Sequence, residues 1–235
     1  MKPELIRDLV IANHILSNEG ILDGLGHIST RNPENSSTFF IARSVPPISV
    51  TEEDIMEVDL DGNPVGGSQG RPVSERFLHA LIYKQRKDVN AIFHGHHPKV
   101  LVFSLIGERL QPVCHLGSFL YQGVPVFKSY EKESGMLISS PHAAEKLAKT
   151  LRNKRAILMY GHGYVVVGET LRQTVAEAIY MVVNADIQLK ILSVGKRSKG
   201  ISRTQAKETM KKALFDDSPL SRMWDYWVQR LHQGR

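Results

Sequence analysis

Apolar positions repeat with a helical period along several parts of the chain. In the segment 3–20 they fall on one face, and Gly20 closes the segment, so a helix is predicted there. The same period predicts further helices over 74–86, 141–152 and 171–192, and a helical segment from about residue 196 to residue 235.

Short apolar runs bounded by turn residues predict the strands. The segment 26–44 is interpreted as strand, polar turn and strand, and 57–65 as a hairpin around Asp61 and Gly62. Further strands are expected over 90–96, 125–127 and 156–160. Helices and short strands alternate irregularly, and the early strands pair with their neighbours. The order predicts one α/β domain over 1–235, a three-layer α/β/α sandwich with a mostly antiparallel central sheet.

The composition is that of an ordinary globular protein, with 42% hydrophobic and 23% charged residues. No apolar run is long enough to cross a bilayer, and Glu4, Arg7 and Asp8 interrupt the apolar pattern that a secretory signal would need. We therefore expect a cytoplasmic protein with no membrane partner. Cys114 is the only cysteine, so a metal ion would have to be held by histidines and carboxylates.

The chain carries a formal net charge of +6, much of it in the basic segment 196–212. That segment has no aromatic residues interleaved for base stacking, so no nucleic-acid partner is expected. A solvated loop and helix face is the favoured interpretation. Attraction of anionic substrates is the milder functional alternative.

Two histidines, His94 and His96, lie two residues apart at the end of a predicted strand, with Gly95 between them. Residues two apart in a strand point to the same face, so both imidazoles can meet one metal ion. His97 points the other way and is interpreted as a structural histidine. Taken alone, the motif is equally consistent with a strand end whose polar side chains are satisfied locally.

A third histidine supports the metal interpretation. His162 follows the apolar strand 156–160, and the flanking Gly161 and Gly163 let the backbone turn tightly at the sheet edge. A lone histidine there would more often be structural. Three neutral nitrogen ligands are the number expected of a catalytic site with open positions. We predict one divalent metal ion per subunit, and the ligand types fit zinc, manganese, iron or cobalt without choosing among them.

Glu75 is the next candidate. Ser74 is the expected N-cap of the helix 74–86, which places Glu75 in the first turn, where a carboxylate can simply stabilise the helix dipole. The functional alternative is a movable carboxylate that ligates the metal ion when no substrate is present and shuttles a proton when substrate displaces it. Glu75 is therefore a candidate catalytic residue.

Five short motifs follow one another along the chain: Gly26-His27-Ile28-Ser29 with Arg31, Val58-Asp59-Leu60-Asp61-Gly62, Ser74-Glu75 with His79, His94-Gly95-His96, and Gly161-His162-Gly163. In this order they resemble the class II aldolase/adducin family over about residues 5–195. The resemblance implies the α/β/α sandwich and a homotetramer with active sites at subunit interfaces. It also implies that His94, His96 and His162 ligate the metal ion and that Glu75 is the catalytic acid or base.

The chain departs from the sugar-phosphate aldolases of this family where those enzymes bind phosphate. Gly-Asn, a Thr-Pro-Ser-Gly-like turn and paired serines are replaced by His27, by Arg-Ser-Val-Pro-Pro over 43–47 and by Val73-Ser74. Planar or charged donors suit a carboxylate, although a surface arginine can also simply pair or cap. His27 becomes a candidate catalytic residue, and the candidate substrate-binding residues include Arg43, Ser29, Arg71 and Ser74.

These departures, with His79 and the terminal tryptophans, are similar to a decarboxylase-like branch of the family. That branch includes hydroxypyridine-dicarboxylate and dihydroxyphthalate decarboxylases and a prenylated hydroxyphenylpyruvate oxygenase. The resemblance implies a metal-dependent lyase, a decarboxylase of a hydroxylated aromatic carboxylate or dicarboxylate. Three alternatives stay open: an aldolase acting on a non-phosphorylated hydroxy-oxoacid, a non-haem iron oxygenase, and a non-catalytic adducin-like scaffold. The intact ligand set argues against the scaffold.

Decarboxylation and aldol cleavage both leave an electron pair that must be delocalised onto an oxygen atom, and a divalent ion there stabilises the charge. Glu75, or a water molecule that it orients, is expected to protonate the ring carbon, while His27 and Arg43 position the substrate. In the loop 114–123, Tyr121 is a further catalytic candidate and His115 a further substrate-binding one, each reaching an active site across a subunit boundary. Ordinary loop packing explains both residues equally well.

Trp224 and Trp227 lie three residues apart, on one face of the helical segment at the end of the chain. With the apolar helix 171–192, they amount to more apolar surface than one domain needs, which predicts an oligomer, most simply a tetramer. Packing within the chain is the alternative for aromatic pairs at helical spacing.

Overall fold

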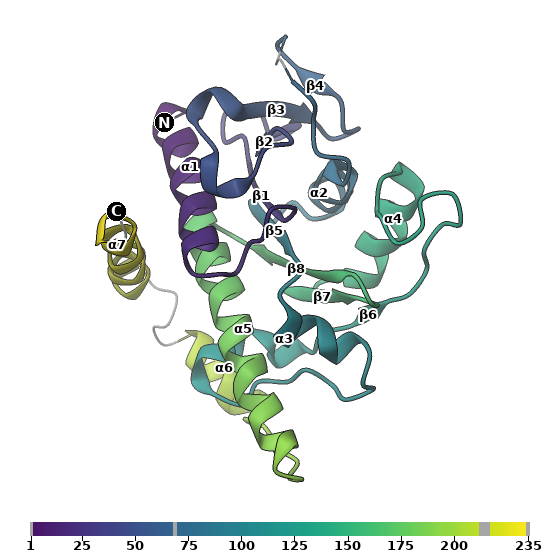
Figure 1. The fold of residues 1–235 in the computed structure, drawn as a ribbon, viewed down its shortest axis with the longest axis vertical. Helices are drawn as coiled ribbons and strands as arrows, with labels where there is room; N and C mark the ends of the chain where they lie inside the picture. Colours follow the sequence, from purple (N-terminus) through teal and green to yellow (C-terminus); the bar gives the residue numbers. More distant parts are fainter. Residues whose placement is uncertain (1, 68–69, 212–216, 234–235) are drawn as a thin grey trace.

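A mixed sheet runs through the centre of the computed structural model, which describes residues 2–67, 70–211 and 217–233 (Figure 1). The strand order within these residues is β4-β3-β2-β1-β5-β8-β7-β6. In chain order the strands are β1 His27–Arg31, β2 Thr38–Ala42, β3 Ile55–Asp59, β4 Pro64–Val65, β5 Ala91–Gly95, β6 Val126–Phe127, β7 Ala156–Met159 and β8 Gly163–Gly168. The β6–β7 pair is parallel and the other described pairs are antiparallel, so the predicted, mostly antiparallel sheet is confirmed.

Alternating side chains divide the two faces of the sheet between separate cores. On β5, Ala91 and Phe93 belong to the core that α1 (Lys2–Asn18) and α5 (Leu171–Ser193) share. Ile92 belongs to the opposite core, with residues of α2 (Arg76–Gln85) and α4 (Pro141–Leu151). This alternation is the two-residue period of a strand. Figure 1 shows helices on both sides of the sheet, and the predicted three-layer sandwich is confirmed.

The remaining elements are η1 Pro47–Ser49, η2 Glu52–Asp54, α3 Pro98–Leu101, η3 Val102–Ser104, η4 His115–Gln122, α6 Arg203–Lys211 and α7 Asp217–Gln233. The predicted loop 114–123 is therefore mostly a 3-10 helix, and the C-terminal helices begin at Arg203 rather than at about residue 196. Strand β8 was not predicted separately, because its valines follow the preceding strand after a turn of only a few residues.

The start of α2 differs from the prediction. The helix begins at Arg76, and Glu75 occupies the N-cap position without capping it through its side chain. The prediction that Ser74 is the N-cap and that Glu75 lies in the first turn is therefore wrong. Partners elsewhere in the chain, namely Ile138, His94 and His162, hold the carboxylate of Glu75.

The tryptophan pair packs inside the chain. Trp224 and Trp227 are both buried in the core that α1 and α5 share. The guanidinium of Arg172 lies 4.9 Å above the ring of Trp224, and the ring of Tyr180 lies 6.0 Å from that of Trp227. The interpretation of this face as surplus apolar surface for assembly is wrong. Across the described residues, no helix combines the length and the apolar character that crossing a membrane requires.

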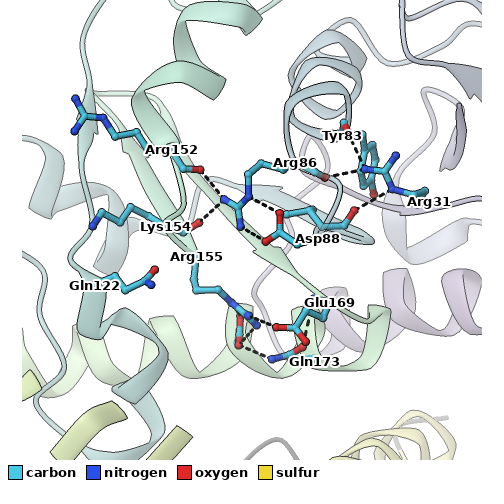
Figure 2. Close-up of polar contacts among 12 residues, drawn as sticks. Arg31, Tyr83, Arg86, Asp88, Gln122, Arg152, Lys154, Arg155, Glu169 and Gln173 are labelled. Atoms are coloured by element: carbon cyan, nitrogen blue, oxygen red, sulfur yellow. Dashed lines mark hydrogen bonds and ion pairs between the residues drawn. The ribbon is translucent and has the colours of Figure 1, made fainter. Parts of the chain in front are cut away.

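A network of ion pairs, here called the arginine network, gathers residues just after α2, just before β7, and just before and within α5 (Figure 2). Its members are Arg86, Asp88, Arg155, Glu169, Gln173 and Glu177. Arg155 contacts Glu177 at 2.6 Å and Glu169 at 3.1 Å, and Arg86 contacts Asp88 at 2.6 Å. Arg86 also donates to the carbonyls of the segment 152–154, so both guanidinium groups of the network are paired within the chain.

Candidate metal centre

The three histidines predicted to bind a metal ion lie together at one end of the sheet. His94 lies near the end of β5, and His96 lies directly beyond that strand. His162 lies in the turn between β7 and β8, and β8 pairs with β5, which brings this turn to the end of β5. Glu75 reaches the same place from the start of α2.

These four residues, here called the histidine cluster, direct one atom each toward a common point. The Nε2 atoms of His94 and His96 are 3.0 Å apart. The Oε2 atom of Glu75 lies 3.4 Å from Nε2 of His94 and 3.5 Å from Nε2 of His162. The four candidate ligand atoms all lie within 4.8 Å of one another. The structure therefore brings together the three predicted ligands and the predicted carboxylate.

The outer nitrogen of each ring determines which nitrogen faces the common point. His94 Nδ1 lies 3.1 Å from the carbonyl of Tyr164, and His162 Nδ1 lies 2.8 Å from the carbonyl of Met136. His96 Nδ1 lies 3.3 Å from a carboxylate oxygen of Asp23. Carbonyl and carboxylate oxygens only accept, so each Nδ1 carries the hydrogen of the neutral ring and donates it.

The inner face of the cluster is consequently made of acceptors alone. Three Nε2 lone pairs and one carboxylate oxygen converge, which is the donor set of a divalent metal site with outer hydrogen bonds that orient the ligands. Burial lowers the pKa of His162, but the negative charge of Glu75 and the carbonyl of Met136 outweigh burial, so the net shift is upward. The residues favour positive charge at this point and fit a divalent cation.

Glu75 is held at both oxygens. The backbone N–H of Ile138 donates to Oε1 over 2.8 Å, while Oε2 faces His94 and His162. Burial would raise the pKa of Glu75, but the facing imidazoles outweigh it and keep that pKa below its ordinary value. A carboxylate whose only role is to stabilise the helix dipole would face the N-terminus of its own helix and would not need these contacts to distant residues.

The glycines beside His162 allow the close approach of strands that the cluster needs. A Cβ atom on Gly163 would lie 2.5 Å from the carbonyl oxygen of Gly95 and 2.9 Å from the ring of His96. Gly161 has a φ of +64°, a backbone conformation that side chains disfavour. The sequence interpretation of these two glycines agrees with this geometry.

A cavity of about 650 Å³ opens onto the cluster. Among the residues that line it are His27, Arg43, Ser74, Glu75, His96 and His162. Asp54 holds the arginine in place, since Nε and Nη2 of Arg43 lie 2.7 Å and 2.6 Å from its Oδ1 atom. The predicted substrate-binding residues Arg43 and Ser74 therefore border the same space as the predicted metal ligands His96 and His162.

Four other predicted residues lie outside this cavity lining. Ser29 is fully buried and its hydroxyl contacts His79 and Tyr83, so the direct substrate contact expected of Ser29 does not fit its position. Arg71 is exposed, and its carbonyl pairs with the N–H of Ser44. His115 and Tyr121 lie on η4, where Tyr121 borders a different cavity.

Several functional contacts were not predicted from the sequence. Asp23, which holds His96, sits just before the Gly26-His27 motif, and a carboxylate in that loop is a signal that could have been used. The backbone groups of Met136 and Ile138, which hold His162 and Glu75, carry no signal in their side chains. Asp54, which holds Arg43, was visible only as part of a capped acidic turn.

A family model confirms the resemblance on which the site was first interpreted. Residues 7–189 match the class II aldolase and adducin N-terminal domain. The chain belongs to this family. It is 30% identical to the decarboxylase tropJ of Talaromyces stipitatus, covering 97% of this chain and 94% of that protein. It is 32% identical to the 3,4-dihydroxyphthalate decarboxylase of Arthrobacter keyseri, covering 80% of this chain and 78% of that protein.

Solved structures of the family share the fold. The L-fuculose 1-phosphate aldolase of Glaciozyma antarctica superposes with a TM-score of 0.80 at 25% identity, covering 97% of this chain and 88% of that one. Enzymes of this family use a divalent metal ion, and the histidine cluster is a group of side chains able to hold one. The class II aldolase chain described here is therefore a metal-dependent lyase that acts on a small molecule.

Proposed function

We propose that this lyase decarboxylates a hydroxylated aromatic carboxylate or dicarboxylate. The observation that carries the proposal is the cavity beside the histidine cluster, where His27 and Arg43 replace the small phosphate-binding residues of the sugar-phosphate aldolases. A guanidinium matches a carboxylate with two parallel donors. Relatives at 30% and 32% identity carry the names of decarboxylases, and one is named for a dihydroxyphthalate.

Arg43 is the proposed carboxylate-binding residue. Its Nε and Nη2 atoms are engaged by Asp54, so the guanidinium plane is fixed before a substrate arrives. The side chain keeps 40% of its surface exposed, which leaves part of the guanidinium open to the cavity. Ser74 is exposed at the same cavity and offers a hydroxyl to the substrate. Arg71 is exposed and does not line the cavity, so it is proposed to contact the substrate only at the outer edge of the cavity.

Glu75 is proposed to move the proton that the reaction needs. Loss of carbon dioxide breaks a carbon–carbon bond and leaves its electron pair on the ring, and one proton must then be added to that ring carbon. Because its pKa is held low, Glu75 carries no proton at first: Oε2, or a water molecule bonded to it, takes the proton of the substrate hydroxyl and passes it to the ring carbon, while Ile138 keeps Oε1 in place. A divalent ion bound by the histidine cluster would stabilise negative charge on a substrate oxygen. Zinc, manganese, iron and cobalt all suit the donor set.

We further propose a cytoplasmic homotetramer with active sites at subunit interfaces. Exposed apolar side chains lie beside the cavity: Leu137 borders it, and Met136 and Leu105 lie next to Gly161. Covering this apolar rim with a second subunit would shield it from water. Tyr121 and His115, which lie away from the cavity of their own chain, would then contribute to a neighbouring active site.

Product analysis tests the proposal. Protein loaded with each of the four metal ions is incubated with hydroxyaromatic mono- and dicarboxylates labelled with ¹³C at the carboxyl carbon, and released carbon dioxide is measured by mass spectrometry. The proposal predicts ¹³CO₂ in proportion to the decarboxylated arene, without oxygen uptake. Protein inactivated by His94→Ala serves as the control for spontaneous decarboxylation.

The alternatives give other products. An aldolase acting on a hydroxy-oxoacid would release pyruvate and an aldehyde, and this alternative is favoured by the fold shared with an L-fuculose 1-phosphate aldolase. An iron-dependent oxygenase would consume oxygen in step with turnover. A non-catalytic scaffold would release none of these products with any metal ion.

A further inference from the structure

A buried row of hydrogen bonds, here called the relay, leads from the core to the cavity. Nδ1 of His27 lies 2.7 Å from Nε2 of His79, and Nδ1 of His79 lies 2.7 Å from the hydroxyl of Ser29. That hydroxyl lies 2.8 Å from the hydroxyl of Tyr83. The ring of Phe39 stacks on His79 and packs against Tyr83, so the inner end of the relay is enclosed by apolar surface.

The hydrogens of the relay can be arranged in one direction without leaving any of them unpaired. Among the described residues, Ser29 is the hydrogen-bond partner of the Tyr83 hydroxyl, so this hydroxyl must donate to Ser29. The hydroxyl of Ser29 then donates to Nδ1 of His79, since the described residues give it no other acceptor. The hydrogen of His79 consequently lies on Nε2 and is donated to Nδ1 of His27.

The opposite direction leaves a hydrogen without a partner. If His27 Nδ1 donated to His79, the hydrogen of His79 would lie on Nδ1 and point at Ser29. The hydroxyl of Ser29 would then either donate to Tyr83 or accept from both neighbours. In the first case the hydroxyl hydrogen of Tyr83 has no acceptor, and in the second the hydroxyl hydrogen of Ser29 has none. A buried donor without an acceptor costs roughly 1–3 kcal/mol, which favours the first direction over both of these arrangements.

We infer that His27 presents Nε2–H to the cavity as a hydrogen-bond donor, and that Ser29, acting through His79, fixes this tautomer. His27 borders the cavity, and within the described part of the chain Nε2 has no protein partner. A nitrogen that carries a hydrogen cannot ligate a metal ion, which separates His27 from the three ligating imidazoles. Ser29 and His79 are positioning residues.

The charge state of the relay agrees with this arrangement. His27 and His79 are both buried, and among the described residues no ion pair joins either ring to a carboxylate. A buried ring without a carboxylate partner favours the neutral form, which carries one hydrogen.

The chemical consequence concerns the substrate oxygen that meets His27. A neutral N–H favours an oxygen that accepts, such as a carboxylate or a phenolate, over a hydroxyl that must donate. The direction of the relay stands on the hydrogen bonds alone, whereas the identity of this oxygen rests on the proposed function.

The test is solid-state ¹⁵N NMR of the zinc-loaded full chain labelled at its histidine rings, with the His27 signals assigned by their loss in His27→Gln. Wild-type protein is expected to show one neutral tautomer at His27, with hydrogen on Nε2. Ser29→Ala removes the donor to His79 and should give a mixture of tautomers. Tyr83→Phe should keep the wild-type signal, because Ser29 then still has His79 as its acceptor.

Ser118→Ala is the matched control, since Ser118 is another fully buried serine and its hydroxyl has no partner in the described chain. It should leave the His27 signals unchanged. Hydrogen on Nδ1 of His27 in the wild type would overturn the inference, as would an unchanged single tautomer in folded Ser29→Ala protein.

Calorimetric titration with 2-hydroxybenzoate adds the test of the substrate oxygen. Ser29→Ala should weaken binding about tenfold, the effect of one hydrogen bond to a charged acceptor, and Ser118→Ala should not. Equal binding by Ser29→Ala and wild type would overturn the role of His27 toward an anionic oxygen. Absence of binding to the wild type would contradict the proposed substrate class, while the tautomer signals would still decide the relay.

Discussion

The histidine cluster and the arginine network both gather charged or polar side chains that are partly buried, but they are completed differently. In the arginine network each guanidinium meets carboxylates of the same chain, Arg155 with Glu177 and Arg86 with Asp88 (Figure 2). In the histidine cluster the outer Nδ1 atoms are paired, while the inner atoms are four acceptors that face one another.

The difference separates a structural site from a chemical one. A buried charge that is paired within the chain stabilises an arrangement of elements and needs nothing further. Convergent acceptors repel one another unless a cation lies between them, so the histidine cluster depends on a partner from outside the chain. Substitutions in the two regions should therefore affect different properties of the protein.

The largest effect is expected from removing a ligand. His94→Ala should abolish stoichiometric metal binding and lower turnover by about a thousandfold or more, because the ion loses one of three nitrogen ligands. Turnover and metal content are measured on the same preparation, and circular dichroism checks the fold. Near wild-type turnover in this variant would contradict a metal role for the cluster.

Glu75→Gln should keep the metal ion and the fold but lower turnover by about a hundredfold or more, as expected when a general acid or base is lost. Glutamine preserves an acceptor for the N–H of Ile138. Steady-state kinetics and melting of the metal-loaded variant check this. Unchanged kcat would remove Glu75 from the chemistry and direct attention to Tyr121 or His27.

Asp23→Asn should weaken metal affinity by about tenfold to a hundredfold, because His96 loses the carboxylate that accepts from its Nδ1 atom. Competition with a chromophoric chelator measures the affinity. Asp88→Asn is the control: it removes a carboxylate charge from the arginine network and should leave metal affinity as it is. A similar loss in both variants would show a general effect of charge.

Glu177→Gln should have the smallest effect on catalysis and a clear effect on stability. Breaking a buried ion pair costs about 3 kcal/mol of unfolding free energy, while Glu169 still neutralises part of the charge of Arg155. Chemical denaturation measures this loss, and kcat and metal content should equal those of the wild type. A loss of metal with no loss of stability would reverse the roles assigned to the two regions.

The convergence of the three histidines could be predicted from the sequence because strand geometry is local. The two-residue period places His94 and His96 together, and the glycines at 161 and 163 bring His162 to the edge of β5. The helix and strand periods likewise predicted most elements of the sandwich. The family resemblance then assigned Glu75, which spacing alone left as a helix-terminus carboxylate.

The contacts that complete the site could not be predicted in this way. The N–H of Ile138 and the carbonyl of Met136 belong to a connection without a regular period, and any residue type supplies the same backbone groups. Ser29 was assigned to substrate because sequence order does not show which face of β1 is covered. In the structure that face meets His79 and Tyr83 of α2.

Metal content per chain tests the account most directly. Protein purified without chelator, exposed to one equivalent of zinc, manganese, iron or cobalt and then dialysed, is analysed by inductively coupled plasma mass spectrometry for the wild type, His94→Ala and Glu177→Gln. The account predicts close to one ion per chain in the wild type and in Glu177→Gln, and close to none in His94→Ala. A wild-type protein that neither contains nor retains any of the four ions, or equal content in His94→Ala, would contradict it.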